Sequence, residues 1–226
     1  YLSIFYKKTH YNNKLMNKKN IKPPLFWEKA KKTLSLKDKK LSKIIKNYPN
    51  DFLYTKSDPF FTLAKSIVGQ QISVKAAQTI WERLETKIIN IHPTTIIKTR
   101  FNTLKSIGLS RQKINYLKNL SYAFIEKKIN LKSWNKMSDE EIILDLTQIK
   151  GIGRWTAEMF LIFNLCRSDI FPLDDIGMIR GLCKLYDIPY PTNKEILIQI
   201  SEKWKPYRSV ATWYLWRSLD PIPVEY

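Results

Sequence analysis

The sequence predicts an all-α protein built from two packed helical lobes, and three observations support this prediction. Apolar residues recur at three- and four-residue intervals in nearly every segment after Phe26, which is the spacing of one helix face. Ser, Thr and Asp precede several of these runs, as expected of helix caps. Strand-like alternation of polar and apolar residues is hard to find. With short connections between the runs, we expect roughly ten helices.

The first well-delimited helix follows a predicted cap at Asp58. Pro59 suits the first helical position because proline lacks the amide hydrogen that would be unpaired there. The helix should bury one face and end near Gly69; that face holds Phe60, Leu63, Ala64 and Ile67. The same spacing predicts two more helices, one through Val74, Ala77, Trp81 and Leu84, the other through Ile114, Leu117, Ser121 and Phe124.

Two capping boxes mark later helix starts, at Ser138-Asp139-Glu140-Glu141 and at Thr192-Asn193-Lys194-Glu195. Before the first helix, residues 1–24 carry scattered lysines and asparagines without hydrophobic periodicity, which predicts a basic tail. Residues 25–226 then form one domain. We expect its first lobe over about residues 60–168 and its second over about residues 25–59 plus 169–226.

The net charge of +19 indicates a polyanionic partner. Basic side chains that neutralise phosphates release condensed counterions and so supply affinity for nucleic acid. The charge alone does not establish such a partner, because 31 of the 39 basic residues are lysines and the chain is rich in Asn and Ile, a pattern that AT-rich coding can produce. Membrane-surface binding and simple solubility are the alternatives to nucleic acid.

Cysteine and histidine are scarce, which excludes several chemistries. The only cysteines, Cys166 and Cys183, are too few for a disulfide-dense scaffold, a four-cysteine iron–sulfur cluster or a four-cysteine zinc site. No apolar run is long enough to cross a bilayer, and the apolar residues of Tyr1–Tyr6 are too few for a signal peptide. A reduced intracellular location is expected. Met16 is an alternative translation start.

The most informative segment runs from Leu146 to Glu158, where two glycines separate a capped helix from a second apolar helix. Gly151 and Gly153 permit positive φ and a close backbone approach, so the free N–H groups that begin the second helix can face a phosphate. This pattern resembles the helix–hairpin–helix motif of DNA-binding proteins. The alternative is an ordinary turn between two helices, punctuated by glycines.

A second element follows at Phe171-Pro172-Leu173-Asp174-Asp175-Ile176-Gly177. Together the two segments resemble the helix–hairpin–helix superfamily of DNA glycosylases, and most closely the DNA-3-methyladenine glycosylase II family. Three more segments agree, at residues 67–77, 107–110 and 204–216, and the resemblance covers about residues 26–220. It implies a substrate cleft between the two lobes.

The resemblance implies that Asp175 is the catalytic acid and Asp174 a helper. A carboxylate near the sugar would stabilise the positive charge that builds up as the base departs. The alternative is that one of these two residues only caps the helix that begins at Ile176.

Trp155 stands where strand-cutting relatives carry a lysine, so the resemblance implies a monofunctional enzyme that uses water as the nucleophile. Trp155 and Trp216 would form walls of the base pocket, since indoles attract a flipped cationic base. Met159 lies where relatives can have an aromatic residue of this pocket. The other five tryptophans are assigned by default to core or surface.

DNA contacts are also implied by the resemblance. Gln71, or its neighbour Gln70, would fill the gap that the flipped nucleotide leaves. Phosphate contacts would come from the hairpin and nearby cations, namely Gly151, Gly153, Lys150, Arg154, Thr156 and Arg208. The backbone carbonyls of Thr147, Ile149 and Ile152 would hold a Na⁺ or K⁺ ion that bridges to a phosphate.

The expected function is therefore excision of alkylated purines from duplex DNA by a monomeric enzyme of base excision repair. No cofactor, iron–sulfur cluster or membrane is expected to take part. The location would be the bacterial cytoplasm with its nucleoid, or a eukaryotic nucleus. Two alternatives stay open: a glycosylase for oxidised or mismatched bases, and a non-catalytic helical module that only docks on DNA.

Overall fold

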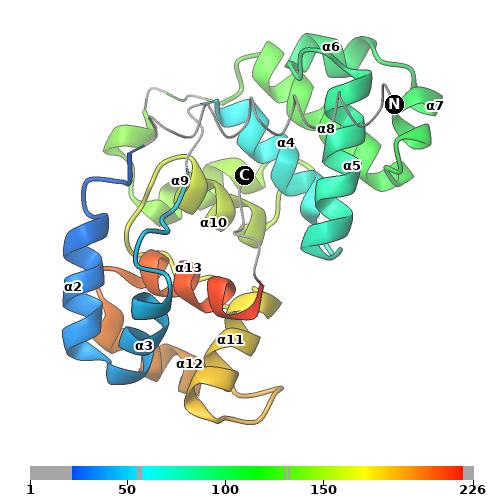
Figure 1. Ribbon diagram of the computed structural model, residues 1–226. Helices are drawn as coiled ribbons and strands as arrows, with labels where there is room; N and C mark the ends of the chain where they lie inside the picture. The colour runs from blue at the N-terminus through cyan, green and yellow to red at the C-terminus, as the bar shows by residue number, and fades with distance from the viewer. Residues whose placement is uncertain (1–21, 55–57, 130, 132, 221–226) are drawn as a thin grey trace.

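The computed structural model describes residues 22–54, 58–129, 131 and 133–220. These residues form twelve α-helices and two short 3-10 helices, with no strand among them, which confirms the predicted fold class (Figure 1). The α-helices are α2 (Trp27–Lys37), α3 (Lys39–Asn47), α4 (Pro59–Gly69), α5 (Val74–Lys87), α6 (Pro93–Lys98), α7 (Phe101–Ser106), α8 (Arg111–Ile125), α9 (Asp139–Thr147), α10 (Arg154–Phe163), α11 (Ile176–Tyr186), α12 (Lys194–Ser201) and α13 (Arg208–Leu219). The 3-10 helices are η2 (Trp134–Lys136) and η3 (Glu202–Trp204).

The helices pack in two groups. In one group α4 lies against α5, α8 and α10, α9 against α10, and α6 and α7 against α8. In the other, α13 packs on α2, α3 and α11, and α12 lies beside η3. Figure 1 shows the first group in its upper and middle part and the second below. The described chain thus begins and ends in the same group, with α4 to α10 between.

Helix boundaries follow the local sequence in most places. The Asp58 side chain accepts a hydrogen bond from the Phe61 amide, so it caps α4 as predicted. Ser138 and Glu141 form both hydrogen bonds of the predicted capping box at α9. The second predicted box is wrong by one residue: the cap of α12 is Asn193, which has extended backbone and accepts from the Glu195 amide. Thr192 lies one residue outside, because asparagine caps helices at least as well as threonine.

Large aromatic side chains fill the core. The five tryptophans outside the motifs are each at most 2% exposed; they are Trp27, Trp81, Trp134, Trp204 and Trp213. No helix in the described part of the chain is long and apolar enough to span a membrane. Of the predicted tail over residues 1–24, only Lys22, Pro23 and Pro24 belong to the described residues, and Met16 lies outside them.

Candidate active site

Three predicted site residues meet where the two helix groups join. Asp175 precedes α11, Trp155 lies in the first turn of α10, and Trp216 lies in α13. The Trp155 Nε1 donates to Asp175 Oδ2 at 2.8 Å, and the Trp216 Nε1 donates to Asp175 Oδ1 at 2.7 Å. The same Oδ1 accepts from the Met178 amide at 2.5 Å. The structure therefore joins these residues through one carboxylate.

Asp175 carries a carboxylate that no cation neutralises. Its side chain caps α11, and the positive end of a helix dipole favours an anion at that position. The residue is only 9% exposed, and no basic nitrogen of the described residues lies within ion-pair distance of it. Three N–H groups thus fix the orientation of a buried carboxylate while its charge stays available to a developing positive charge nearby.

Asp174 differs from its neighbour in both position and partner. Its exposed carboxylate pairs with the Lys194 ammonium on the surface. The residue of this pair that caps α11 is therefore Asp175, whose side chain accepts from the Met178 amide.

Two of the residues predicted for the base pocket have quite different surroundings. Trp155 is half-buried and retains accessible surface. Trp216 is buried and stacks on Phe163 with ring centroids 5.7 Å apart. Met159 is only 1% exposed, because neighbouring core residues cover its side chain, and its contact with a base stays a prediction. The indole N–H bonds to Asp175 are a feature that the spacing in the sequence did not reveal.

The hairpin between α9 and α10 depends on its two glycines for different reasons. Gly151 has φ +111°, and a Cβ there would lie 2.3 Å from Tyr116 Cγ. Gly153 caps α10 with φ −94°, so it does not use the positive φ that glycine permits, because a helix cap takes extended backbone. No atom lies within 4 Å of the position of a Gly153 Cβ. The first amides of α10 lack intrahelical acceptors.

Gln70 connects this hairpin to the end of α4. Its Nε2 donates to the Gly151 carbonyl and to the Thr156 Oγ1, both at 2.9 Å. Thr156 is buried, and its Oγ1 is already occupied by the bond from Gln70. Gln71 follows with φ 57° and an exposed side chain that has no hydrogen-bond partner among the described residues. Of the two glutamines, Gln71 is the one free to enter a duplex.

The two arginines predicted to bind phosphate are already paired with carboxylates. Arg154 contacts Glu140 through both terminal nitrogens and donates from Nε to Glu158 at 3.1 Å. Arg208 binds the Asp169 side chain through Nε and Nη2, each at 2.9 Å. Either arginine would have to exchange an ion pair to reach DNA. Lys150 is exposed, and its ammonium has no carboxylate partner in the described chain.

Glu158 is a titratable residue near this site that sequence reasoning missed. Burial raises its pKa to about 7, while the Arg154 guanidinium acts in the opposite direction. Its spacing of four residues from Arg154 on a helix is a signal that could have revealed the pair.

Comparison with known proteins places this arrangement in a family. Residues 64–206 match the HhH-GPD superfamily base excision DNA repair protein. The chain therefore belongs to this superfamily.

Within the superfamily, the chain is similar to DNA-3-methyladenine glycosylase 1 of Schizosaccharomyces pombe, with 37% identity over 80% of this chain and 81% of the relative. A Saccharomyces cerevisiae DNA-3-methyladenine glycosylase is 34% identical over 80% of this chain and 76% of its own length. A solved structure of the S. pombe 3-methyladenine DNA glycosylase in complex with abasic DNA has a TM-score of 0.77, covering 84% of this chain and 96% of that one.

Proposed function

We propose that this protein is a monofunctional DNA glycosylase that removes alkylated purines of the 3-methyladenine type from duplex DNA, the first step of base excision repair. The observation that carries the proposal is the Asp175 carboxylate, held by two indole N–H groups and a helix amide where the lobes join. The similarity to two named 3-methyladenine glycosylases at 34% identity or more supports the substrate class.

The proposed chemistry follows from the charge of this carboxylate. Cleavage of an N-glycosidic bond builds positive charge on the sugar, and a preorganised anion lowers the energy of that transition state. Asp175 would also orient the attacking water. An alkylated purine is already cationic, so it leaves with little need for a general acid. The face of Trp155 would attract such a base by stacking and by cation–π interaction.

The hairpin and Gln71 would position the DNA. Amides at the start of α10 would bind a phosphate beside Gly153, while Gln71 would occupy the space left by the flipped nucleotide. We expect the hairpin turn to hold a monovalent cation; the Ile149 carbonyl accepts from the Ile152 amide at 2.9 Å and has a second lone pair that could coordinate the ion. Together with the carbonyls of Thr147 and Ile152 it would hold Na⁺ or K⁺, which would add a positive charge at the phosphate.

Base release from methylated duplex DNA tests the function directly. Wild-type protein should release 3-methyladenine with EDTA present, and Asp175→Asn should lose most of this activity while still binding abasic DNA. Asp174→Asn is the matched control and should keep it, because Asp174 pairs with Lys194 on the surface. Tight duplex binding without release of any base would support the docking module instead, and release of oxidised bases alone would support the other glycosylase class.

The fate of the DNA strand tests the monofunctional assignment. With Trp155 in place of a lysine, no imine should form. Borohydride should therefore trap no covalent protein–DNA adduct, and the strand should break only after hot alkali. A trapped adduct with wild-type protein would overturn this assignment.

Substitution of the hairpin glycines tests the docking. Gly153→Val should lower the free energy of unfolding by only about 1 kcal/mol, because valine is a poorer helix cap but its Cβ meets no atom of the described residues beyond its two chain neighbours. It should weaken binding to all duplexes to a similar degree, since phosphate contacts carry no sequence information. Gly151→Val is not an equivalent test, because its side chain would collide with Tyr116 and destabilise the fold. Unchanged affinity in a folded Gly153→Val protein would exclude the hairpin from the interface.

A further inference from the structure

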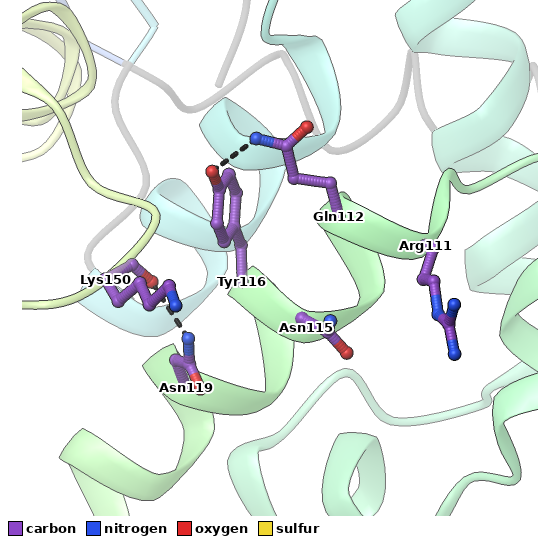
Figure 2. Close-up of a pocket in the computed structure, with 6 residues that line it drawn as sticks. All are labelled: Arg111, Gln112, Asn115, Tyr116, Asn119 and Lys150. Atoms are coloured by element: carbon purple, nitrogen blue, oxygen red, sulfur yellow. Dashed lines mark hydrogen bonds between the residues drawn. The ribbon is translucent and has the colours of Figure 1, made fainter.

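A groove of about 550 Å³ lies beside the hairpin, on the exposed face of α8. Figure 2 shows its lining: five residues come from α8, and Lys150 comes from the hairpin. All six are polar or basic, and none carries a carboxylate; they are Arg111, Gln112, Asn115, Tyr116, Asn119 and Lys150. The groove thus offers N–H and O–H donors along its length and a cation at each end.

The groove is built onto the hairpin. The Asn119 Nδ2 donates to the Lys150 carbonyl at 3.2 Å, and the Tyr116 ring fills the space beside Gly151. In Figure 2, Asn119 and Lys150 lie at one end of the row and Arg111 at the other. The groove therefore adjoins the hairpin that leads into α10.

The cations of the groove differ from the neighbouring arginines in that they have no carboxylate partner among the described residues. Carboxylates neutralise both Arg154 and Arg208. Neither Arg111 nor Lys150 has a carboxylate within ion-pair distance among the described residues, and both are exposed. Cations without a partner can neutralise DNA phosphates without first breaking an ion pair, and each phosphate contact releases counterions.

The dimensions match a nucleic-acid backbone. From Arg111 to Asn119 a helix rises about 12 Å at 1.5 Å per residue. One strand of B-DNA places a phosphate every 3.4 Å along its axis, so this length corresponds to about three phosphates. Arg111, Asn115 and Asn119 recur every four residues and so share one side of α8.

We propose that the α8 groove is a second phosphate-binding site, which holds the DNA backbone beyond the phosphate at the hairpin. This proposal rests on the proposed binding of duplex DNA. Arg111 and Lys150 would neutralise phosphates, and the amides of Gln112 and Asn115 would donate hydrogen bonds to phosphate oxygens. The site would contribute affinity and register without reading the base sequence.

Salt-dependent binding to a duplex with a tetrahydrofuran abasic-site analogue tests the groove. Loss of one phosphate contact in Arg111→Gln should reduce the slope of log affinity against log salt by about 0.9. Between 50 and 200 mM KCl, the variant should then lose about 3.5-fold less affinity than wild type. Lys46→Gln is the control for net charge, because Lys46 is exposed on α3 in the other helix group.

A second pair of variants keeps the test independent of the arginine. Asn115→Asp places a negative charge in the groove and should weaken binding several-fold relative to Asn115→Ala. The groove proposal is overturned if Arg111→Gln has the slope of Lys46→Gln, or if the two Asn115 variants bind equally. These results are separate from the proposed function, because absence of base release by wild-type protein would reject the enzyme activity while the salt slopes still decide the groove.

Discussion

Two buried aspartates of this protein share one local design and differ in their surroundings. Asp38 caps α3, and its Oδ1 accepts from the Lys40 and Leu41 amides. Its Oδ2 accepts from the Trp204 Nε1 at 2.8 Å and from the Tyr186 hydroxyl. Asp175 likewise caps a helix and accepts from indole nitrogens. A helix cap with tryptophan donors is therefore a structural device that this chain uses twice.

The difference lies in the compensating charge. The Lys203 ammonium lies 3.2 Å from Asp38 Oδ2, whereas the donors that reach Asp175 within the described residues are all neutral. Burial raises the pKa of Asp38, but its hydrogen bonds lower it more, so the net pKa lies below the usual range. Asp38 is thus paired with a lysine of its own lobe. The charge of Asp175 remains available to a positively charged group on a bound molecule. We propose that the same kind of cap contributes to stability at Asp38 and to chemistry at Asp175.

Asp175→Asn should show the largest effect in the comparison. Loss of one electrostatic contact to a transition state costs about 3 kcal/mol, so the rate of base release should fall by at least about 100-fold. Stability should fall by only about 1 kcal/mol, because asparagine also caps helices and only one indole loses its acceptor. Single-turnover base release and urea unfolding measure the two quantities. A large loss of stability with little loss of rate would reverse the assignments of the two aspartates.

Asp38→Asn should give the opposite result. Loss of the charge weakens the hydrogen bonds that Tyr186 and Trp204 donate to Oδ2 and the pair with Lys203, which should cost about 2 kcal/mol of the free energy of unfolding. The rate of base release by the folded variant should not change. Asp51→Asn is a control, because its pair with Arg217 is partly exposed and should contribute under about 1 kcal/mol.

The pH dependence of stability gives a further check on Asp38. Its folded pKa lies below its unfolded value, so the stabilisation is present above the unfolded pKa and is lost as pH falls through the folded pKa. Wild type and Asp38→Asn should therefore become more alike in acid unfolding below about pH 4. A difference that persists to the lowest pH would show that shape, rather than charge, stabilises the cap.

Glu158 is a third buried carboxylate, and its pKa is shifted in the opposite direction from that of Asp38. Because burial raises its pKa to about 7, its stabilising contribution is full below the unfolded pKa and is lost as pH rises through 7. Glu158→Gln should be more stable than wild type at pH 8, by on the order of 2 kcal/mol, and similar to it below about pH 4. Thermal unfolding across this range measures the difference. Equal pH profiles would show that Arg154 fully compensates the buried charge.

Removing single indole donors should have small effects on the rate of base release. Trp155→Phe keeps an aromatic face but loses the bond to Asp175, and should slow base release by about 5- to 10-fold, which corresponds to about 1 kcal/mol. Trp204→Phe, the matched change at Asp38, should leave the rate unchanged, while the lost hydrogen bond and the cavity left in the core should reduce stability by about 2 kcal/mol or more. Base release and unfolding by the two variants give a direct comparison. Equal rates for Trp155→Phe and wild type would limit Trp155 to stacking.

Much of this architecture could be predicted from local sequence. Helix periodicity and caps such as Asp58 and Ser138 depend on residues within one turn, which is why these predictions were correct. The motif match also identified Asp175, Trp155 and Trp216 as a group. Their mutual hydrogen bonds remained hidden, because they depend on how α10, α11 and α13 pack, and spacing along the chain does not determine that.

The least predictable features were the partners of charged and polar side chains. Arg154 in α10 pairs with Glu140 in α9, on the other side of the hairpin. Arg208 pairs with Asp169, which lies 39 residues earlier in the chain. A basic residue near a DNA-binding motif is therefore a good candidate for a phosphate contact only if it forms no ion pair with a carboxylate of the same protein. Gln70 shows the same limit, since its bonds to the hairpin span more than 80 residues.

The backbone at Gln71 has a consequence for protein engineering. This residue follows the C-cap of α4 in the left-handed region, a position that glycine usually occupies. A non-glycine residue there costs on the order of 1 kcal/mol, and no hydrogen bond in the described chain offsets it. Selection for thermostability alone would therefore favour Gln71→Gly. The proposed wedge would be lost in such a selection, so a library screened without a DNA repair readout should enrich stable proteins that flip bases poorly.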